Sequence, residues 1–201
     1  MVITMELFAQ FFVTALTAVA VENAVFARAL GINKTVLFMK SPKMGILYGA
    51  VLTWMGVLSS FLVAMVNVLL EGRTGIMYIR APLFSICVAA VYIVTYLVAH
   101  KWKPKLFQII KPALPVCTFN TALFGAFYIS STGSYHFLQT VGYTLGTGVG
   151  YTLALLVIYF ARKRLAISPV PRSFRGLPIL LLYIGLLSLA IYGLLGHGLP
   201  S

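Results

Sequence analysis

The sequence predicts an all-α integral membrane protein of six transmembrane helices, arranged as two inverted three-helix repeats with broken helices 1 and 4. Three observations indicate this fold: an apolar composition, six apolar runs near membrane-spanning length, and a sorting of basic residues between loops. Of the 201 residues, 61% are hydrophobic and 9% are charged, and the mean hydropathy is +0.99. Soluble globular domains are about 25% charged, so this composition excludes that class.

Six runs of apolar sequence meet or approach the length of about 20 residues that a bilayer core requires. They cover residues 4–30, 45–70, 81–99, 106–129, 137–160 and 174–195. We expect them to form one membrane domain over residues 1–201, with the first repeat in about 1–100 and the second in about 101–201.

Basic residues are concentrated around the loops that follow the first, third and fifth runs, which together hold thirteen of the fifteen Lys and Arg residues. Because cytoplasmic loops carry the excess of Lys and Arg, these three loops should be cytoplasmic and both termini should face outward. The net charge of +12 arises because the chain has just three acidic residues. Since no single solvated face gathers the basic residues, the expected partner is the lipid bilayer and not a nucleic acid.

The first run is longer than one crossing requires and carries Glu22, Asn23 and Arg28. An acidic residue at membrane depth costs about 2.5 to 3.5 kcal/mol and marks a candidate site for ion coordination or proton transfer. Arg28 is a candidate partner for Glu22, but a spacing of six residues would require a helix break, or Arg28 would extend to the interface instead. The alternative is a structural Glu22, protonated or paired at a subunit contact.

The fourth run contains Pro112 and Pro115, which remove backbone donors and predict a break near residues 112–121. The segment NTALFG at 120–125 repeats the pattern of NAVFA at 23–27, and each lies in the first run of its half.

Interrupted backbone at membrane depth is tolerated where it is buried in protein or lines a polar cavity, so we expect the two breaks to meet near the midplane. The ion-path candidates are Glu22, Asn23, Asn120 and Thr121. The alternative is a pair of ordinary helices, with a proline kink and hydrogen-bonded polar residues at their interface.

In the fifth run, Gly142, Gly146 and Gly150 recur at four-residue intervals and predict a groove for close helix packing, flanked by Tyr143 and Tyr151. The basic, proline-containing segment 168–176 predicts an ordered turn at the cytoplasmic headgroups.

Cysteine and histidine show no pattern typical of catalysis or of a metal site. Cys87 and Cys117 lie within apolar runs and are expected to be small buried side chains. His100, His136 and His197 lie near the ends of runs without ligand spacing. We therefore predict no catalytic residue and no metal ligand, and at most a non-catalytic subunit of an enzyme complex.

Four segments of the chain resemble RnfA, a membrane subunit of the Rnf electron-transport complex, and, more distantly, its Nqr counterparts. They are MYIRAPLF at 77–84, LPVCTFNTALFGA at 114–126, HFLQ at 136–139 and YFARKRLAISPVPRSFRG at 159–176. The resemblance implies six spans with half-helices in the first and fourth, outward termini, and a place in the bacterial or archaeal cytoplasmic (inner) membrane. It also implies other Rnf-type subunits as partners, among them the homologous RnfE, with which RnfA shares an iron–sulfur cluster.

The chain departs from this family at both cluster cysteines. Where the family reads LGLCP, this chain has LGINK with Asn33 at the match, and where it reads TNCAVLG, this chain has FNTALFG with Thr121 at the match. Iron–sulfur clusters are held by thiolates, or by histidine in one class, so we expect no cluster on this chain. Cys117, one helical turn before Thr121, is at best a poor substitute. The position of the first amide in the family's VNN phrase is Glu22 here.

Two functions remain open at this point. The first is a membrane subunit of an Rnf-like electron-transport complex coupled to sodium or proton translocation, acting with partner subunits. The alternative is a stand-alone or homodimeric transporter or channel for ions or small solutes, built on the same scaffold without a redox cofactor.

Overall fold

The computed structural model describes residues 2–33, 39–70 and 77–194, and within these ranges it contains helices, turns and loops but no strand. Five of its helical segments are long and apolar enough to cross a membrane, and Met5–Val21 forms a shorter apolar helix. The all-α membrane fold is therefore confirmed. Of the residues discussed above, His197 lies outside the described residues.

The first span is interrupted halfway, so the run 4–30 is part helix and part turn. Helix α1 (Val2–Leu16) continues into a π-helical segment, η1 (Thr17–Val21). The backbone N–H of Glu22 donates to the carbonyl of Thr17 at 2.8 Å, five residues back, and the helix ends there. Turns follow, and Ala29 and Gly31 adopt φ angles of 53° and 79° in the left-handed region, which redirects the chain.

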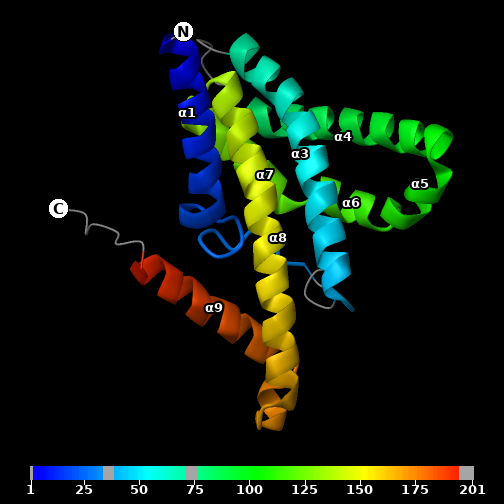
Figure 1. The fold of residues 1–201 in the computed structure, drawn as a ribbon, viewed down its shortest axis with the longest axis vertical. Helices are drawn as coiled ribbons and strands as arrows, with labels where there is room; N and C mark the ends of the chain where they lie inside the picture. Colours follow the sequence, from blue (N-terminus) through cyan, green and yellow to red (C-terminus); the bar gives the residue numbers. More distant parts are fainter. Residues whose placement is uncertain (1, 34–38, 71–76, 195–201) are drawn as a thin grey trace.

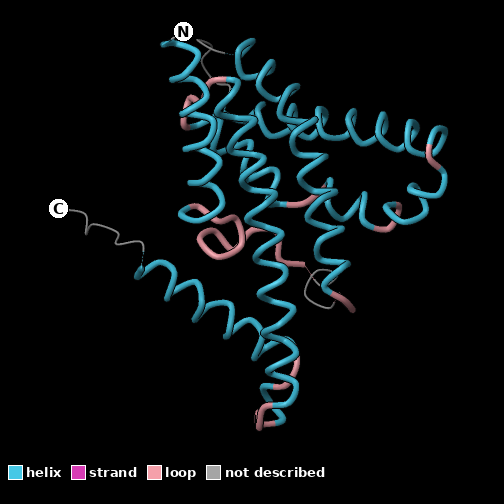
Figure 2. The backbone as a smooth tube through the Cα atoms, viewed as in Figure 1, coloured by secondary structure: helices cyan, strands magenta, loops and turns pink. Residues whose placement is uncertain are grey.

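The fourth span turns at Lys111 and Pro112, and its interruption within the predicted window comes after both prolines. It consists of α5 (Pro104–Ile110), α6 (Ala113–Thr118) and α7 (Thr121–Thr132), and α6 and α7 are separated at Phe119 and Asn120. Pro115 lies in the first turn of α6, where a backbone N–H would have no partner inside the helix, so the helix tolerates it. Figure 2 shows both interruptions as loop segments between helices.

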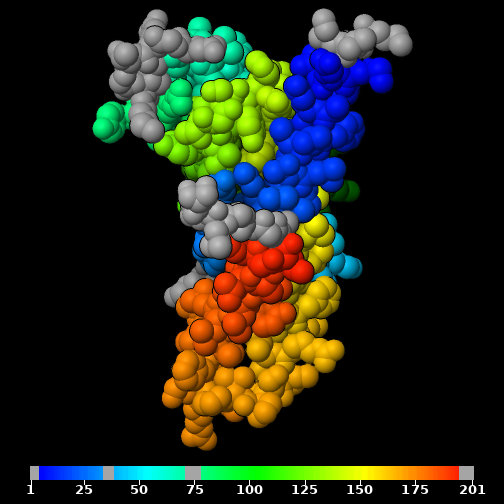
Figure 3. All heavy atoms as spheres, turned by 90° about the vertical axis from the view of Figure 1, so that its left-hand side faces the viewer, coloured from blue at the N-terminus to red at the C-terminus, as the bar shows by residue number. Residues whose placement is uncertain are grey.

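The remaining helices are α3 (Pro42–Leu70), α4 (Met77–Trp102), α8 (Phe137–Ile167) and α9 (Leu177–Leu194). Helix α8 runs along the molecule between α1 and α3, and α4, α5 and α6 extend to one side (Figure 1). The predicted turn at 168–176 contains a 3₁₀ turn, η2 (Arg172–Phe174). Helix α9 leads away from it, and Figure 3 shows α9 below the first span on the face turned to the viewer.

The predicted glycine groove on α8 receives the first span. A Cβ atom on Gly142 would lie 2.6 Å from the carbonyl oxygen of Phe11, and one on Gly146 would overlap the backbone of Ala15. One on Gly150 would lie 3.1 Å from the Cα atom of Val19. Because these three positions lack side chains, α1 and η1 lie directly against α8. The first interruption therefore lies beside the middle of that helix.

Candidate functional site

Asn23 holds the first interruption together and attaches it to α8. Its side chain is buried, and Oδ1 accepts hydrogen bonds from the backbone N–H groups of Val25 at 3.0 Å and Phe26 at 3.3 Å. Its Nδ2 donates to the carbonyls of Val19 at 3.0 Å and Gly150 at 3.1 Å. One amide thus satisfies backbone groups that the missing helix would have paired.

Asn120 has the same role at the second interruption, where it caps the following helix and bonds to α8. Its Oδ1 caps α7 by accepting from the N–H of Ala122 at 2.9 Å, and its Nδ2 donates to the Tyr151 hydroxyl at 2.9 Å. That hydroxyl in turn donates to the carbonyl of Gly31 at 3.1 Å, and the N–H of Gly31 donates to Thr121 Oγ1 at 2.8 Å. The two interruptions are therefore hydrogen-bonded to each other, directly and through Tyr151.

Gly31 is a point of close approach between the interruptions. A Cβ atom there would lie 2.6 Å from Cε2 of Tyr151 and 2.9 Å from Oδ1 of Asn120, and its φ of 79° is one that L residues rarely adopt. Since Gly150 and Tyr151 lie near the middle of α8 (Phe137–Ile167), the contact is central along that helix. We call Asn23, Gly31, Asn120, Thr121 and Tyr151 the neutral layer.

Glu22 belongs to a second layer, which is charged. Its Oε2 accepts from Arg28 Nη2 at 3.1 Å and from the Tyr143 hydroxyl at 2.7 Å. Glu22 and Arg28 are six residues apart, a spacing that requires a helix break if they are to pair, and the interruption provides this break. Arg28 therefore lies in the interruption beside Glu22. Glu22, Arg28 and Tyr143 are the charged layer.

The two layers lie at different levels of α8. Tyr143 and Tyr151 are eight residues apart, which corresponds to about 12 Å along a helix. The structure thus brings Asn23, Asn120 and Thr121 together around one level of α8 and places Glu22 nearer the start of that helix.

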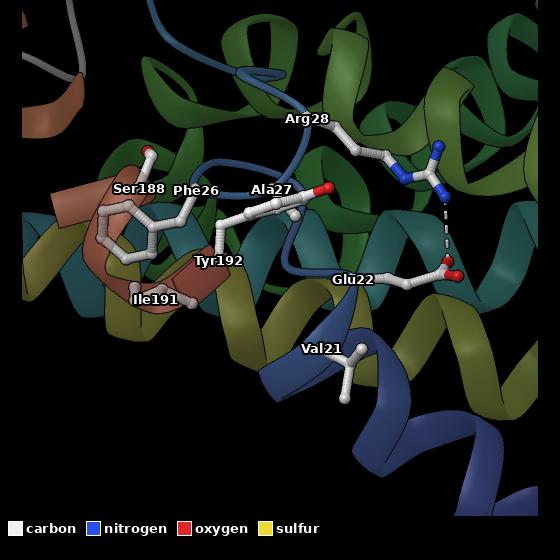
Figure 4. A pocket seen from close by; sticks show the side chains of 8 residues that line it. All are labelled: Val21, Glu22, Phe26, Ala27, Arg28, Ser188, Ile191 and Tyr192. Atoms are coloured by element: carbon white, nitrogen blue, oxygen red, sulfur yellow. Dashed lines mark hydrogen bonds and ion pairs between the residues drawn. The ribbon is translucent and has the colours of Figure 1, made fainter. Parts of the chain in front are cut away.

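Two hollows adjoin the charged layer. One of about 240 Å³ lies between the first interruption and α9, and Figure 4 shows the side chains around it. Its lining comprises Val21, Glu22, Phe26, Ala27, Arg28, Ser188, Ile191 and Tyr192. In Figure 4 the Tyr192 hydroxyl extends from α9 toward the side on which Glu22 and Arg28 lie. The other hollow, of about 620 Å³, includes Arg28 and otherwise residues from the first interruption, α4 and α7.

Tyr143 and Tyr151 of α8 are site residues whose partners the sequence did not reveal. Both were expected beside the glycine groove, and both are buried, but their hydroxyls contact segments more than a hundred residues away. The sequence signal that could have identified them is two tyrosines eight residues apart on a glycine-rich helix. Tyr135, before α8, packs edge to face against Tyr143 with ring centroids 5.6 Å apart. Burial, and then the nearby Glu22 carboxylate, raise the pKa of the Tyr135 phenol.

The residues at the family's cluster positions do not fit an iron–sulfur cluster. Thr121 uses its hydroxyl to accept from Gly31, and Asn33 offers an amide where a thiolate is needed. Cys117 is 1% exposed and its Sγ donates to the carbonyl of Tyr48 at 3.2 Å. Across the described ranges, no group of three or more His, Cys, Asp and Glu residues could hold a metal ion.

Taken together, several membrane-length helices and two interrupted spans joined by hydrogen bonds define a multi-pass membrane protein with a polar site at broken helices. Residues 11–197 match the family described as "Rnf-Nqr subunit, membrane protein", and the chain belongs to this family. The resemblance seen in the sequence is confirmed.

Named relatives agree with this assignment. They are RnfA proteins, the A-type subunits of the ion-translocating oxidoreductase complex. The chain is 30% identical over 178 residues to those of Yersinia enterocolitica and Yersinia pestis, covering 89% of this chain and 92% of each relative. It is 29% identical to the protein of the same name from Vibrio atlanticus, covering 89% of this chain and 93% of that relative.

Proposed function

We propose that the chain is a membrane subunit of an Rnf-like electron-transport complex coupled to sodium or proton translocation, and that it acts with partner subunits. Family membership and the names of the relatives support this assignment. The observation that carries the ion-handling part is the contact between the two interrupted spans, because transporters place ion sites at such interruptions.

In this proposal the ion path includes Glu22, Asn23, Asn120 and Thr121. No electron-transfer step is assigned to the chain, because Asn33 and Thr121 occupy the positions of the family's cluster cysteines and Cys117 is engaged with Tyr48. The chain thus keeps the scaffold of the family and supplies a carboxylate, Glu22, in the interruption.

The partners and the placement in the membrane follow from the same reasoning. The direct neighbour is a homologous RnfE-like protein or a second copy of this chain, beside other Rnf-type subunits. The membrane is the cytoplasmic (inner) membrane of a bacterium or archaeon, with both termini outside and the basic loops inside. Asn23 and Asn120 play matching roles at the two interruptions, which supports two inverted repeats of about 1–100 and 101–201.

The test is purification of the native complex through a tag on this chain, followed by reconstitution into liposomes. We expect flavin- and ferredoxin-type subunits to co-purify and electron transfer to drive ion movement. Glu22→Gln should abolish ion movement without loss of assembly, whereas Glu6→Gln, which alters an exposed acid on α1, should leave it intact. Unchanged ion movement in Glu22→Gln would leave Glu22 a structural role only.

A second candidate is a stand-alone or homodimeric transporter or channel on the same scaffold. The absence of both cluster cysteines favours it. Purification of the chain alone or as a homodimer, with ion flux in liposomes that needs no electron donor, would establish this candidate in place of the first.

A further inference from the structure

We infer that the ion exchanged at Glu22 is a proton, and that Tyr143 and Arg28 are the groups that position its carboxylate for this exchange. This inference deepens the proposed ion path and rests on it. It assigns a role to Tyr143, which lies on α8 outside the segment that contains Glu22 and Arg28.

The geometry of the charged layer suits a proton better than a metal cation. Glu22 Oε2 already receives Arg28 at 3.1 Å and Tyr143 at 2.7 Å. A sodium ion at this oxygen would stand beside the positive guanidinium, and the two charges would repel each other. A proton instead neutralises the carboxylate, so Arg28 is released from it without a second cation being bound.

Four backbone oxygens of the interruption already accept hydrogen bonds. Sodium sites at broken helices use carbonyls of unwound backbone. Here the carbonyls of Asn23, Ala24 and Val25 accept from the N–H groups of Ala27, Leu30 and Ala29, respectively. The carbonyl of Gly31 accepts from Tyr151. A proton needs one oxygen, and Glu22 supplies it.

The proton reaches Glu22 from the hollow beside α9. That hollow of about 240 Å³ has four polar side chains in its lining, Glu22, Arg28, Ser188 and Tyr192, so it is polar and roomy enough to hold water. Protonation forms one O–H bond on the carboxyl group with a proton that a hydronium ion in this hollow releases, which leaves a water molecule, while Arg28 and Tyr143 keep their own protons. The titratable groups that face Glu22 include Arg28, Tyr143 on α8, Tyr135 before α8 and Tyr192 on α9.

Carbodiimide labelling of the full-length chain in nanodiscs tests this inference without the rest of the complex. Dicyclohexylcarbodiimide is apolar and modifies protonated carboxylic acids, and peptide mass spectrometry identifies the modified residue. We expect Glu22 to be labelled, faster as the pH is lowered, and at the same rate in sodium chloride and potassium chloride. Protection by sodium would overturn the inference in favour of a sodium site, and labelling that is absent or independent of pH would overturn it in favour of a fixed ion pair.

Two matched variants separate positioning from a general loss of structure. Tyr143→Phe should increase the labelling rate of Glu22 several-fold, because a hydrogen bond that favours the charged carboxylate is lost. Tyr159→Phe, at a buried tyrosine of α8 outside both layers, should leave that rate unchanged, and Glu6 serves as the internal reference in every sample. An equal effect of both tyrosine variants would refute the role of Tyr143. The outcome is independent of whether partner subunits are found, so it can fail while the proposed function stands.

Discussion

The two interrupted spans use the same residue type at the break but continue from it differently. At each, an asparagine side chain accepts from the backbone N–H two residues on, at 3.0 Å for Asn23 and 2.9 Å for Asn120. Each amide then donates to α8, to Gly150 or to Tyr151. After Asn120 a helix begins at once, whereas after Asn23 the chain makes turns as far as Gly31.

This difference shows how an interrupted span can hold a pair of charged side chains. After the second interruption the chain forms a helix at once, so the backbone groups pair within α7. The side chains at this interruption are neutral. The first interruption leaves more backbone to satisfy, and its turns carry Arg28 back to Glu22. In the proposed ion path, the first interruption thus supplies the charged side chains, and the second supplies the neutral side chains that are hydrogen-bonded to it.

The largest effect should come from removing the asparagine of the first interruption. Asn23→Ala loses four hydrogen bonds and should lower the free energy of unfolding by roughly 2–4 kcal/mol. Asn120→Ala loses two and should cost roughly half as much, since α7 can still form. Unfolding of both variants in mixed micelles, followed by circular dichroism, measures the difference. Equal losses would mean that the two interruptions depend on their asparagines equally, contrary to this comparison.

The sequence predicted the existence of both interruptions, because a proline pair and an acid inside apolar runs are local signals. The sequence located the second interruption only to within about ten residues. Pro115 is accommodated in the first turn of α6, and the break lies instead at Asn120, which caps α7. The separation into two layers was not predictable. It depends on Tyr143 and Tyr151 reaching Glu22 and Gly31, and contacts 120 residues or more apart cannot be read from local pattern in one sequence.

A smaller effect should follow from filling the glycine positions that support each interruption. Gly146→Ala places a methyl group against the backbone of Ala15, which cannot move without shifting α1, so we expect a loss of about 1–3 kcal/mol. Gly125→Ala on α7 meets the tip of the Leu30 side chain, which can turn aside, and should cost less than about 1 kcal/mol. Gly185→Ala on α9 has open space and serves as the control. Thermal unfolding in detergent ranks the stabilities of the three variants. A Gly125 variant that is less stable than the Gly146 variant would contradict the rigid docking of the first span.

The smallest effect on stability should come from removing the ion pair between Glu22 and Arg28. This pair is nevertheless the feature that most clearly distinguishes the first interruption from the second. The side chains of Arg28 and Glu22 are 40% and 31% exposed, and we expect water in the adjoining hollow to screen them. A double-mutant cycle of Glu22→Gln and Arg28→Gln should therefore give a coupling energy of about 0–1 kcal/mol, as for other hydrated pairs. A coupling of several kcal/mol would indicate a dry, buried pair instead. With a small coupling, the charged layer contributes little to folding at an interruption that Asn23 already holds, which would favour the proposed role in proton exchange over a structural one.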